Sequence, residues 1–453
     1  MVYGFPCERR HPSSSTLNYL QMRRHTFLKH LLILAILSVA VPIATASDLE
    51  DSETWKQFRG NNATSIASGQ KVPVNLGKET LRWSVNLSGP GSSSPVIWGE
   101  RLFVTSEDRE AGQVELFCLN AKSGKQLWSK RISTGTYHVH NFNNLASGTP
   151  CVTEKHVVLG WYDTSTTHAM VTAFSHDGDS LWTRDLGKFD SQHGVSFNPI
   201  AMDDRVIVGN LHMGGGTVVA YSLEDGSLIW SHTNPVGAKT SYSAPLIREL
   251  HGSDAKEVVL VGELFGMVGV DFETGKENWS LPDAFNHRTI TSPIILKDDP
   301  ATGEVLVAAG NKNNVYFAVR MPQFSNGEKV SEAEKVWSME SRAPYVPTPV
   351  VVGDVVYALH DGGTLSALDV STGEARWKGK LLGNFYASPV LVDEKLYCLS
   401  REGDMWVVET GDEFKQLKTS SLNPPEDVTF CDATPAVAHN RLYVRLGSRL
   451  DCY

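Results

Sequence analysis

Along most of the chain, short apolar runs alternate with polar segments that contain glycine. A representative stretch is 350–359, where three valines, a Gly-Asp pair and a second apolar run follow Pro349. Short apolar runs bounded by glycine predict β-strands joined by tight turns. After residue 46 no run has the length and apolar character of a membrane-spanning helix. The pattern therefore predicts an all-β protein.

One strand–turn–strand unit recurs in altered copies. The fullest copy, 367–377, reads Ala-Leu-Asp-Val-Ser-Thr-Gly-Glu-Ala-Arg-Trp, and others lie at 118–128, 173–182, 220–230 and 269–279. Glycine suits the turn because one position of such a turn usually needs a positive φ. The closing tryptophan can bury a large ring against the next copy. We expect docking tryptophans at Trp83, Trp128, Trp182, Trp230, Trp279, Trp337 and Trp377.

A proline opens each repeat. The eight positions are Pro95, Pro150, Pro199, Pro245, Pro293, Pro349, Pro389 and Pro435. They recur about every 49 residues, and a period near 40–50 built from short strands is typical of propeller blades. The alternative is an ordinary β-sandwich with coincidental turns, which eight ordered copies of proline, strands, glycine turn and tryptophan disfavour.

The two ends of the repeat array predict how the ring closes. Residues 434–453 have room for about three strands, and 79–86 supply one further strand with Trp83. Pairing that strand with the C-terminal three completes an eighth blade and removes a free sheet edge. The sequence thus predicts an eight-bladed β-propeller over 79–453, closed by its N-terminal strand. Residues 47–78 are an irregular lead-in along the disc, with Trp55 and Phe58 as buried anchors.

The N-terminus carries the features of a targeting segment. Residues 22–29 are basic, 31–41 are apolar but short for a bilayer, and 44–46 read Ala-Thr-Ala. This order predicts a secretory signal within 1–46, with Met22 as the initiator and a periplasmic or secreted mature protein. An uncleaved anchor helix is the alternative. The mature domain is not expected to span a membrane.

The net charge and the cysteine content disfavour two classes of function, nucleic acid binding and a cysteine-based metal site. Without residues 1–46, 36 basic and 50 acidic side chains remain, a net charge of −14, which disfavours binding to nucleic acid phosphates. Five cysteines remain, at Cys118, Cys151, Cys398, Cys431 and Cys452, without a Cys-x-x-Cys spacing. We expect mostly buried thiols, at most two disulfides and no metal framework.

The tryptophan-closed turn resembles the tryptophan-docking motif of pyrroloquinoline-quinone-type β-propellers. Ala367, Asp369, Thr372, Gly373 and Trp377 match the whole motif. The chain also resembles the secreted PQQ-like repeat proteins, from about residue 55 to its end. Four further short segments carry this resemblance: 57–60, 140–141, 192–194 and 441–445.

That resemblance implies two branches of function. Quinoprotein alcohol dehydrogenases bind the quinone over calcium and usually carry adjacent cysteines beneath it, which this sequence lacks. Their catalytic Asp and their Glu and Asn metal ligands match no motif here either. The other branch, similar to the propeller scaffold of the outer-membrane barrel-assembly machinery, holds protein partners and binds no quinone. That branch typically carries a lipid-anchoring cysteine, which is also missing.

The residues just before each anchor proline should converge on one rim of the central channel. They are rich in aromatic, polar and charged groups, which favours a binding pocket for a protein or small-molecule ligand. The candidates are Tyr137, His138, His140, Asn141, His193, Lys239, Tyr242, His287, Arg288, Arg342, Tyr345, Asn384, Tyr386 and Asp432. The plainer alternative is that these aromatics only cap the channel.

Chemistry at this rim is less well supported. His138 and His140, with His193 or His287, suggest a metal site, although rim histidines more often serve as surface hydrogen-bonding groups. No hydrolase elbow, zinc-protease motif or phosphate loop is present, so no catalytic residue is assigned. We expect an exported, non-catalytic binding or scaffolding propeller without a cofactor. The alternative is an oxidoreductase that uses pyrroloquinoline quinone and calcium on alcohols or sugars, with Lys239, Arg288 or Arg342 pairing the quinone carboxylates and Tyr242, Tyr345 or Phe385 stacking on its rings.

Overall fold

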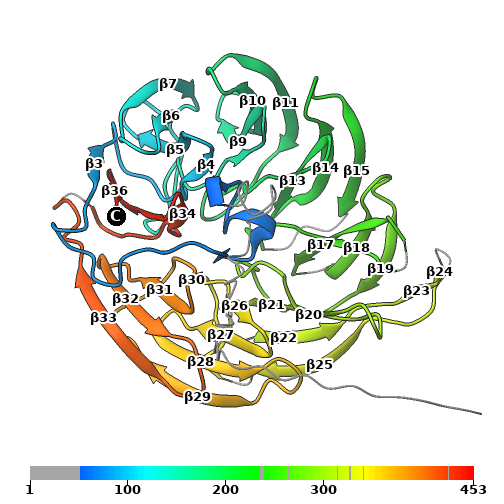
Figure 1. Ribbon diagram of the computed structural model, residues 1–453. Coiled ribbons are helices and arrows are strands. Elements are labelled where there is room, and N and C mark those ends of the chain that lie inside the picture. Colours follow the sequence, from blue (N-terminus) through cyan, green and yellow to red (C-terminus); the bar gives the residue numbers. More distant parts are fainter. Residues whose placement is uncertain are drawn as a thin grey trace, which may run out of the picture. The chain divides into compact units, whose positions relative to one another are not determined.

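The described residues form eight blade sheets, each with four antiparallel main strands, and this confirms the predicted fold class (Figure 1). The computed structural model describes residues 52–234, 239–251, 253–263, 265–313, 315–325, 328–339, 341–426 and 428–453. All of them belong to one unit, Thr45–Tyr453. The predicted secretory segment 1–46, including Met22, lies outside the described residues.

Each blade has four main strands, numbered from the innermost outward in the first seven blades. Blades one to four are β4–β7 (Val96–Trp98, Arg101–Asp108, Gln113–Asn120, Gln126–Ser133), β8–β11 (Cys151–Val152, His156–Asp163, His168–Ser175, Ser180–Lys188), β12–β15 (Ile200–Met202, Arg205–His212, Gly215–Ser222, Leu228–Asn234) and β16–β19 (Leu246–Glu249, Lys256–Gly262, Gly266–Asp271, Glu277–Leu281). Blades five to seven are β20–β22 with β25 (Ile294–Asp299, Glu304–Asn311, Val315–Arg320, Glu334–Met339), β26–β29 (Val350–Val352, Val355–Leu359, Thr364–Asp369, Ala375–Lys380) and β30–β33 (Val390–Val392, Lys395–Leu399, Asp404–Glu409, Lys415–Ser421).

Blade eight joins the two ends of the repeat array. It contains β34 (Ala436–Ala438), β35 (Arg441–Leu446), β36 (Arg449–Cys452) and β3 (Trp83–Asn86). β3 is antiparallel to β36, with Trp83 opposite Cys452 and Asn86 opposite Arg449. In Figure 1 the blue β3 lies beside the red β36.

Tryptophans in the outer strands, most of them near the start of the strand, dock on the turn of the following blade. Each indole Nε1 donates to a backbone carbonyl there, at 2.8–3.1 Å: Trp83 to Ala121, Trp128 to His176, Trp182 to Leu223, Trp230 to Phe272, Trp337 to Val370 and Trp377 to Gly411. The turn glycine leaves room for the ring. A Cβ added at Gly373 would lie 2.5 Å from Trp337.

Blade five departs from the repeat. No turn glycine among its described residues packs on Trp279 of the preceding blade, and the Nε1 of Trp279 finds no hydrogen-bond partner there. An insertion after β22 instead forms the small hairpin of β23 (Phe324–Ser325) and β24 (Glu328–Lys329). In β33 of blade seven, Leu417 stands where the other outer strands carry tryptophan.

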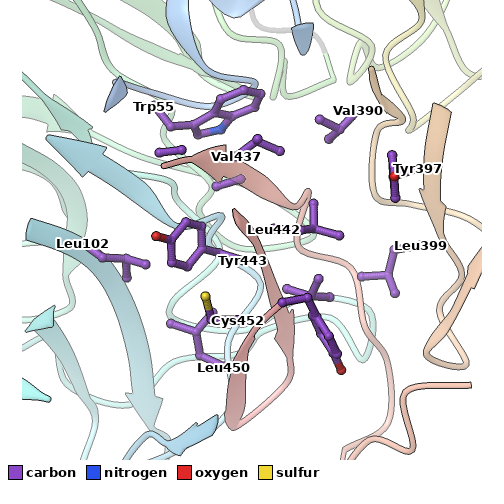
Figure 2. Packing of buried hydrophobic residues seen from close by; sticks show 14 of the residues in the cluster. Trp55, Leu102, Val390, Tyr397, Leu399, Val437, Leu442, Tyr443, Leu450 and Cys452 are labelled. Carbon is purple, nitrogen blue, oxygen red and sulfur yellow. The ribbon is translucent and has the colours of Figure 1, made fainter. Parts of the chain in front are cut away.

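The lead-in runs across the inner strands of several blades. β1 (Thr54–Trp55) pairs with β4 of blade one, and β2 (Ile66–Ala67) runs parallel to β30 of blade seven. Between them lies the 3-10 turn η1 (Asn61–Ala63). Trp55 is buried beside Val437, in the same cluster as residues of blade eight (Figure 2). Phe58 is only half-buried, because it lines a cavity.

Two further features concern the class of protein. All five cysteines of the described residues are buried and unpaired. No helix in the described part of the chain has the length and apolar character needed to cross a membrane.

Candidate functional site

The loops that precede the innermost strands surround a cavity of about 200 Å³. Each blade supplies this loop just before its anchor proline, so residues far apart in sequence meet there. The lining residues are Phe58, Ser92, Ser94, Phe142, Asn143, Ser147, Thr149, His193, Ser196, Asn198, Tyr242, Arg288, Ile290, Tyr345, Val346, Tyr386, Asp432 and Thr434. We call this space the rim cavity. Its aromatic walls with a few polar groups are the composition expected of a ligand site.

Six of the candidate residues from the sequence line the rim cavity: His193, Tyr242, Arg288, Tyr345, Tyr386 and Asp432. The other eight are on the same loops but outside the lining: Tyr137, His138, His140, Asn141, Lys239, His287, Arg342 and Asn384. His138, Asn141, Arg342 and Asn384 are exposed. Tyr137 instead packs edge-on against Tyr162, with ring centroids 4.7 Å apart.

An arginine that sequence reasoning missed organises one side of the rim. Arg401 is held by Asp432 through two hydrogen bonds, of 2.7 and 2.9 Å. Its guanidinium carbon lies 3.5 Å from the ring centroid of Phe430 and 3.8 Å from that of Tyr386. Phe142, from the loop before blade two, reaches the same cluster at 5.0 Å and remains 51% exposed. The signal in the sequence is weak, because Arg401 follows β31 and precedes no proline.

Hydrogen bonds fix other parts of the cavity wall. The Tyr242 hydroxyl donates to the Gly194 carbonyl at 3.0 Å and lies 2.6 Å from the Ser191 hydroxyl. Burial raises the pKa of Tyr242, so the phenol keeps its proton. The Asp361 carboxylate accepts the amides of Tyr345 and Val346, both at 3.1 Å, which positions the Tyr345 ring at the cavity.

Two of the proposed metal-binding histidines meet. The rings of His140 and His193 lie 4.3 Å apart, although they come from different loops. Burial, helped by the nearby charges of Arg288 and His140, lowers the pKa of His193 to about 4. In residues 52–453, as far as they are described, no group of three or more His, Cys, Asp or Glu side chains is placed to hold a metal ion.

The cavity residues do not fit the calcium of a quinoprotein. Calcium takes six to eight oxygen ligands, several of them usually carboxylates. Asp432 is the one carboxylate among the described lining residues, and both of its oxygens already accept from Arg401. Burial raises the pKa of Asp432, which also weakens it as a metal ligand.

The chain matches the sequence model of a family described as "Outer membrane protein assembly factor BamB". The matched segments are 69–234, 167–334 and 327–450. The protein of that name from Burkholderia pseudomallei is 25% identical over 369 residues, which is 80% of this chain and 83% of the relative. The one from Yersinia pestis is 25% identical over 276 residues, 58% of this chain and 62% of the relative.

Solved structures share the fold at lower identity. BamB from Moraxella catarrhalis aligns with a TM-score of 0.52 at 15% identity, covering 82% of this chain and 96% of that one. The computationally designed Ika8 protein aligns with the same TM-score at 14% identity, covering 85% and 99%. At such identities the likeness concerns the fold alone.

Proposed function

Because the chain belongs to the BamB family of PQQ-like repeat propellers, we propose that it is an exported, non-catalytic scaffold that holds a protein partner at its rim. The family match over most of the propeller is the observation that carries this proposal. The relatives are named as outer membrane protein assembly factors, so we place the protein in the periplasm, next to the outer membrane. The predicted secretory segment agrees with that compartment.

The aromatic cluster on the rim is suited to a protein partner. Arginine and large aromatic residues dominate the binding energy of protein interfaces, and they do so best when they are held rigidly. Arg401 is fixed between Phe430 and Tyr386 and paired with Asp432, so this platform needs little further ordering. Phe142 presents the exposed ring that a partner can cover.

The described cavity residues offer little catalytic machinery. A general base works best with a pKa near the working pH, and His193, at about 4, is a weak base at neutral pH. The Tyr242 phenol is held protonated, and the Asp432 carboxylate is engaged by Arg401. These groups suit recognition better than proton transfer.

Site-specific crosslinking in living cells tests the scaffold. A photoreactive phenylalanine derivative at position 142 is compared with the same group at position 330, an apolar site that is at least as exposed (60% against 51%) and directly follows the β23–β24 hairpin. We expect position 142, and not position 330, to give a discrete crosslinked protein that mass spectrometry identifies. The same crosslinked proteins at both positions, or no crosslinked protein at position 142, would contradict a partner bound at the rim.

A second assay addresses the enzymatic alternative. Purified protein is mixed with pyrroloquinoline quinone and calcium, and dye reduction is followed with alcohols and sugars. We expect no turnover above that of the free quinone. Saturable quinone binding with substrate-dependent turnover would replace the scaffold by an oxidoreductase.

A further inference from the structure

Arg288 is a buried cation with no counter-charge among the described residues. Its side chain is in the wall of the rim cavity and the residue is only 5% exposed. Its two nearest polar contacts are long, 3.5 Å from Nη1 to the Tyr345 hydroxyl and 3.4 Å from Nη2 to Gln192 Oε1. Its Nε finds no partner among the described residues. No described carboxylate comes within salt-bridge distance of it.

Arg59 and Arg445 are also buried without a described carboxylate partner, but their guanidinium groups donate to backbone carbonyls of Thr64 and Pro349 and of Ser93 and Gly447. Two further buried arginines are paired with carboxylates. Arg248 pairs with Glu257 at 2.9 Å, and Arg401 pairs with Asp432. Burying a charge is costly unless it is paired and hydrogen-bonded. Arg288 differs from all four, because it lines the rim cavity and its guanidinium has only the two long contacts, which leaves its donors open to an anion.

The surroundings restrict what that anion is attached to. Tyr242, Tyr345, Tyr386 and Ile290 supply flat and apolar walls. A dry cavity of roughly 150 Å³ accommodates benzene. The rim cavity, at about 200 Å³, thus holds one such ring and a small charged group. A guanidinium binds a carboxylate with two parallel hydrogen bonds, and it is less hydrated than an ammonium group.

We propose that the rim cavity binds a carboxylate carried on a single benzene-sized ring, with Arg288 as the anion-binding residue. This assigns the chemistry of the ligand and rests on the proposed binding function of the rim. The carboxylate has two sources. One is a free aromatic acid, and the other is an acidic side chain next to an aromatic residue on the scaffolded partner.

Isothermal titration of the mature protein with phenylacetate, and with its uncharged analogue phenylacetamide, tests the proposal. We expect saturable one-to-one binding of phenylacetate and affinity for phenylacetamide lower by at least about tenfold. Arg288→Gln should abolish this discrimination, and Arg288→Lys should keep part of it. Arg342→Gln, an exposed arginine on the same rim, is the matched control and should bind as the wild type does. Equal binding of acid and amide, or unchanged binding by Arg288→Gln, would overturn the proposal.

Thermal unfolding of the free protein gives a readout independent of the ligand. Arg288→Met removes an unmatched charge, so its midpoint should equal or exceed that of the wild type. A large fall would mean that Arg288 only supports the fold. Phenylacetate should raise the midpoint of the wild type and not that of Arg288→Met.

Two blocked dipeptides separate the sources. Acetyl-Phe-Glu-amide is compared with acetyl-Phe-Gln-amide, since both lack a free terminal carboxylate. Selective binding of the glutamate peptide assigns the site to a partner side chain, and binding of phenylacetate alone assigns it to a free acid. If neither ligand binds while crosslinks at position 142 persist, the carboxylate proposal fails and the scaffold stands. If both bind without any crosslink, the scaffold fails instead.

Discussion

The backbone amide of Thr348 donates to the hydroxyl of Ser388 at 3.0 Å, and both residues directly precede an anchor proline. The residue before one anchor proline donates its amide in the same way to the side-chain oxygen before the next, at 3.0–3.2 Å: Ser94 to Thr149, Thr149 to Oδ1 of Asn198, Ala244 to Ser292, Ser292 to Thr348 and Ser388 to Thr434. Ala244 has no acceptor side chain, so the series is interrupted there. These bonds tie the inner end of one blade to the next.

Removing one of these hydroxyls should destabilise the protein. Ser388→Ala leaves the buried amide of Thr348 without its acceptor, and we expect a loss of about 1–3 kcal/mol in the free energy of unfolding. Denaturant unfolding followed by tryptophan fluorescence measures it. Ser371→Ala, which removes an exposed turn hydroxyl, should change stability by less than about 0.5 kcal/mol. Equal losses of stability in Ser388→Ala and Ser371→Ala would mean that the buried hydrogen bond does not stabilise the fold.

A second prediction concerns the space that the turn glycine leaves for the docking tryptophan. Gly373→Ala places a methyl group 2.5 Å from Trp337 at a φ of +71°, whereas Gly353→Ala meets nothing within 4 Å at a φ of +58°. The shared backbone penalty is about 1 kcal/mol, and the clash should add roughly 1–3 kcal/mol to Gly373→Ala alone. Urea unfolding of the pair separates the two effects. Similar losses in both variants would show that the tryptophan contact is unimportant.

The fold was predictable from the sequence because its determinants are local. The residue types at Pro349, Gly373 and Trp377 recur in most repeats at similar spacing. The proline marks the start of a strand, the glycine permits the turn, and the tryptophan packs against the next blade. The serine or threonine before many of the prolines was also visible. The role of this residue in joining neighbouring blades could not be predicted, because the acceptor of each amide belongs to the next blade, about 50 residues away along the chain.

The candidate site was predictable only to the level of the rim. Arg288 and Arg342 both stand in loops before an anchor proline, yet one is buried in the cavity wall and the other is exposed with a φ of 53°. The length and composition of a loop do not determine how deeply each of its side chains is buried. Phe142 reaches the cavity because it contacts Phe430 and Arg401 of other blades, and those contacts exist only in the closed ring.

The Arg401–Asp432 pair supplies a third prediction. Asp432→Asn leaves Arg401 buried without its charge partner, and breaking such a pair costs about 3–5 kcal/mol. The double variant Arg401→Met, Asp432→Asn should recover much of that loss, since the methionine can still fill the space between Phe430 and Tyr386. A double-mutant cycle from urea unfolding tests this. Additive losses would contradict a direct coupling.

The last prediction follows from His193. Its pKa in the folded protein is about 4, below the ordinary 6.5, because burial and the charge of Arg288 disfavour the imidazolium. Between these values the unfolded chain binds more protons at this position than the folded one does. The contribution of His193 to stability is therefore complete above pH 6.5 and declines as the pH falls towards 4. His193→Gln should lose less stability than the wild type over that interval, and the two curves should run parallel above about pH 7.5. Unfolding midpoints measured across the pH range, together with an NMR titration of the His193 ring, check this. A ring midpoint near 6.5, or parallel curves throughout, would show that the ring is not held neutral in the cavity wall.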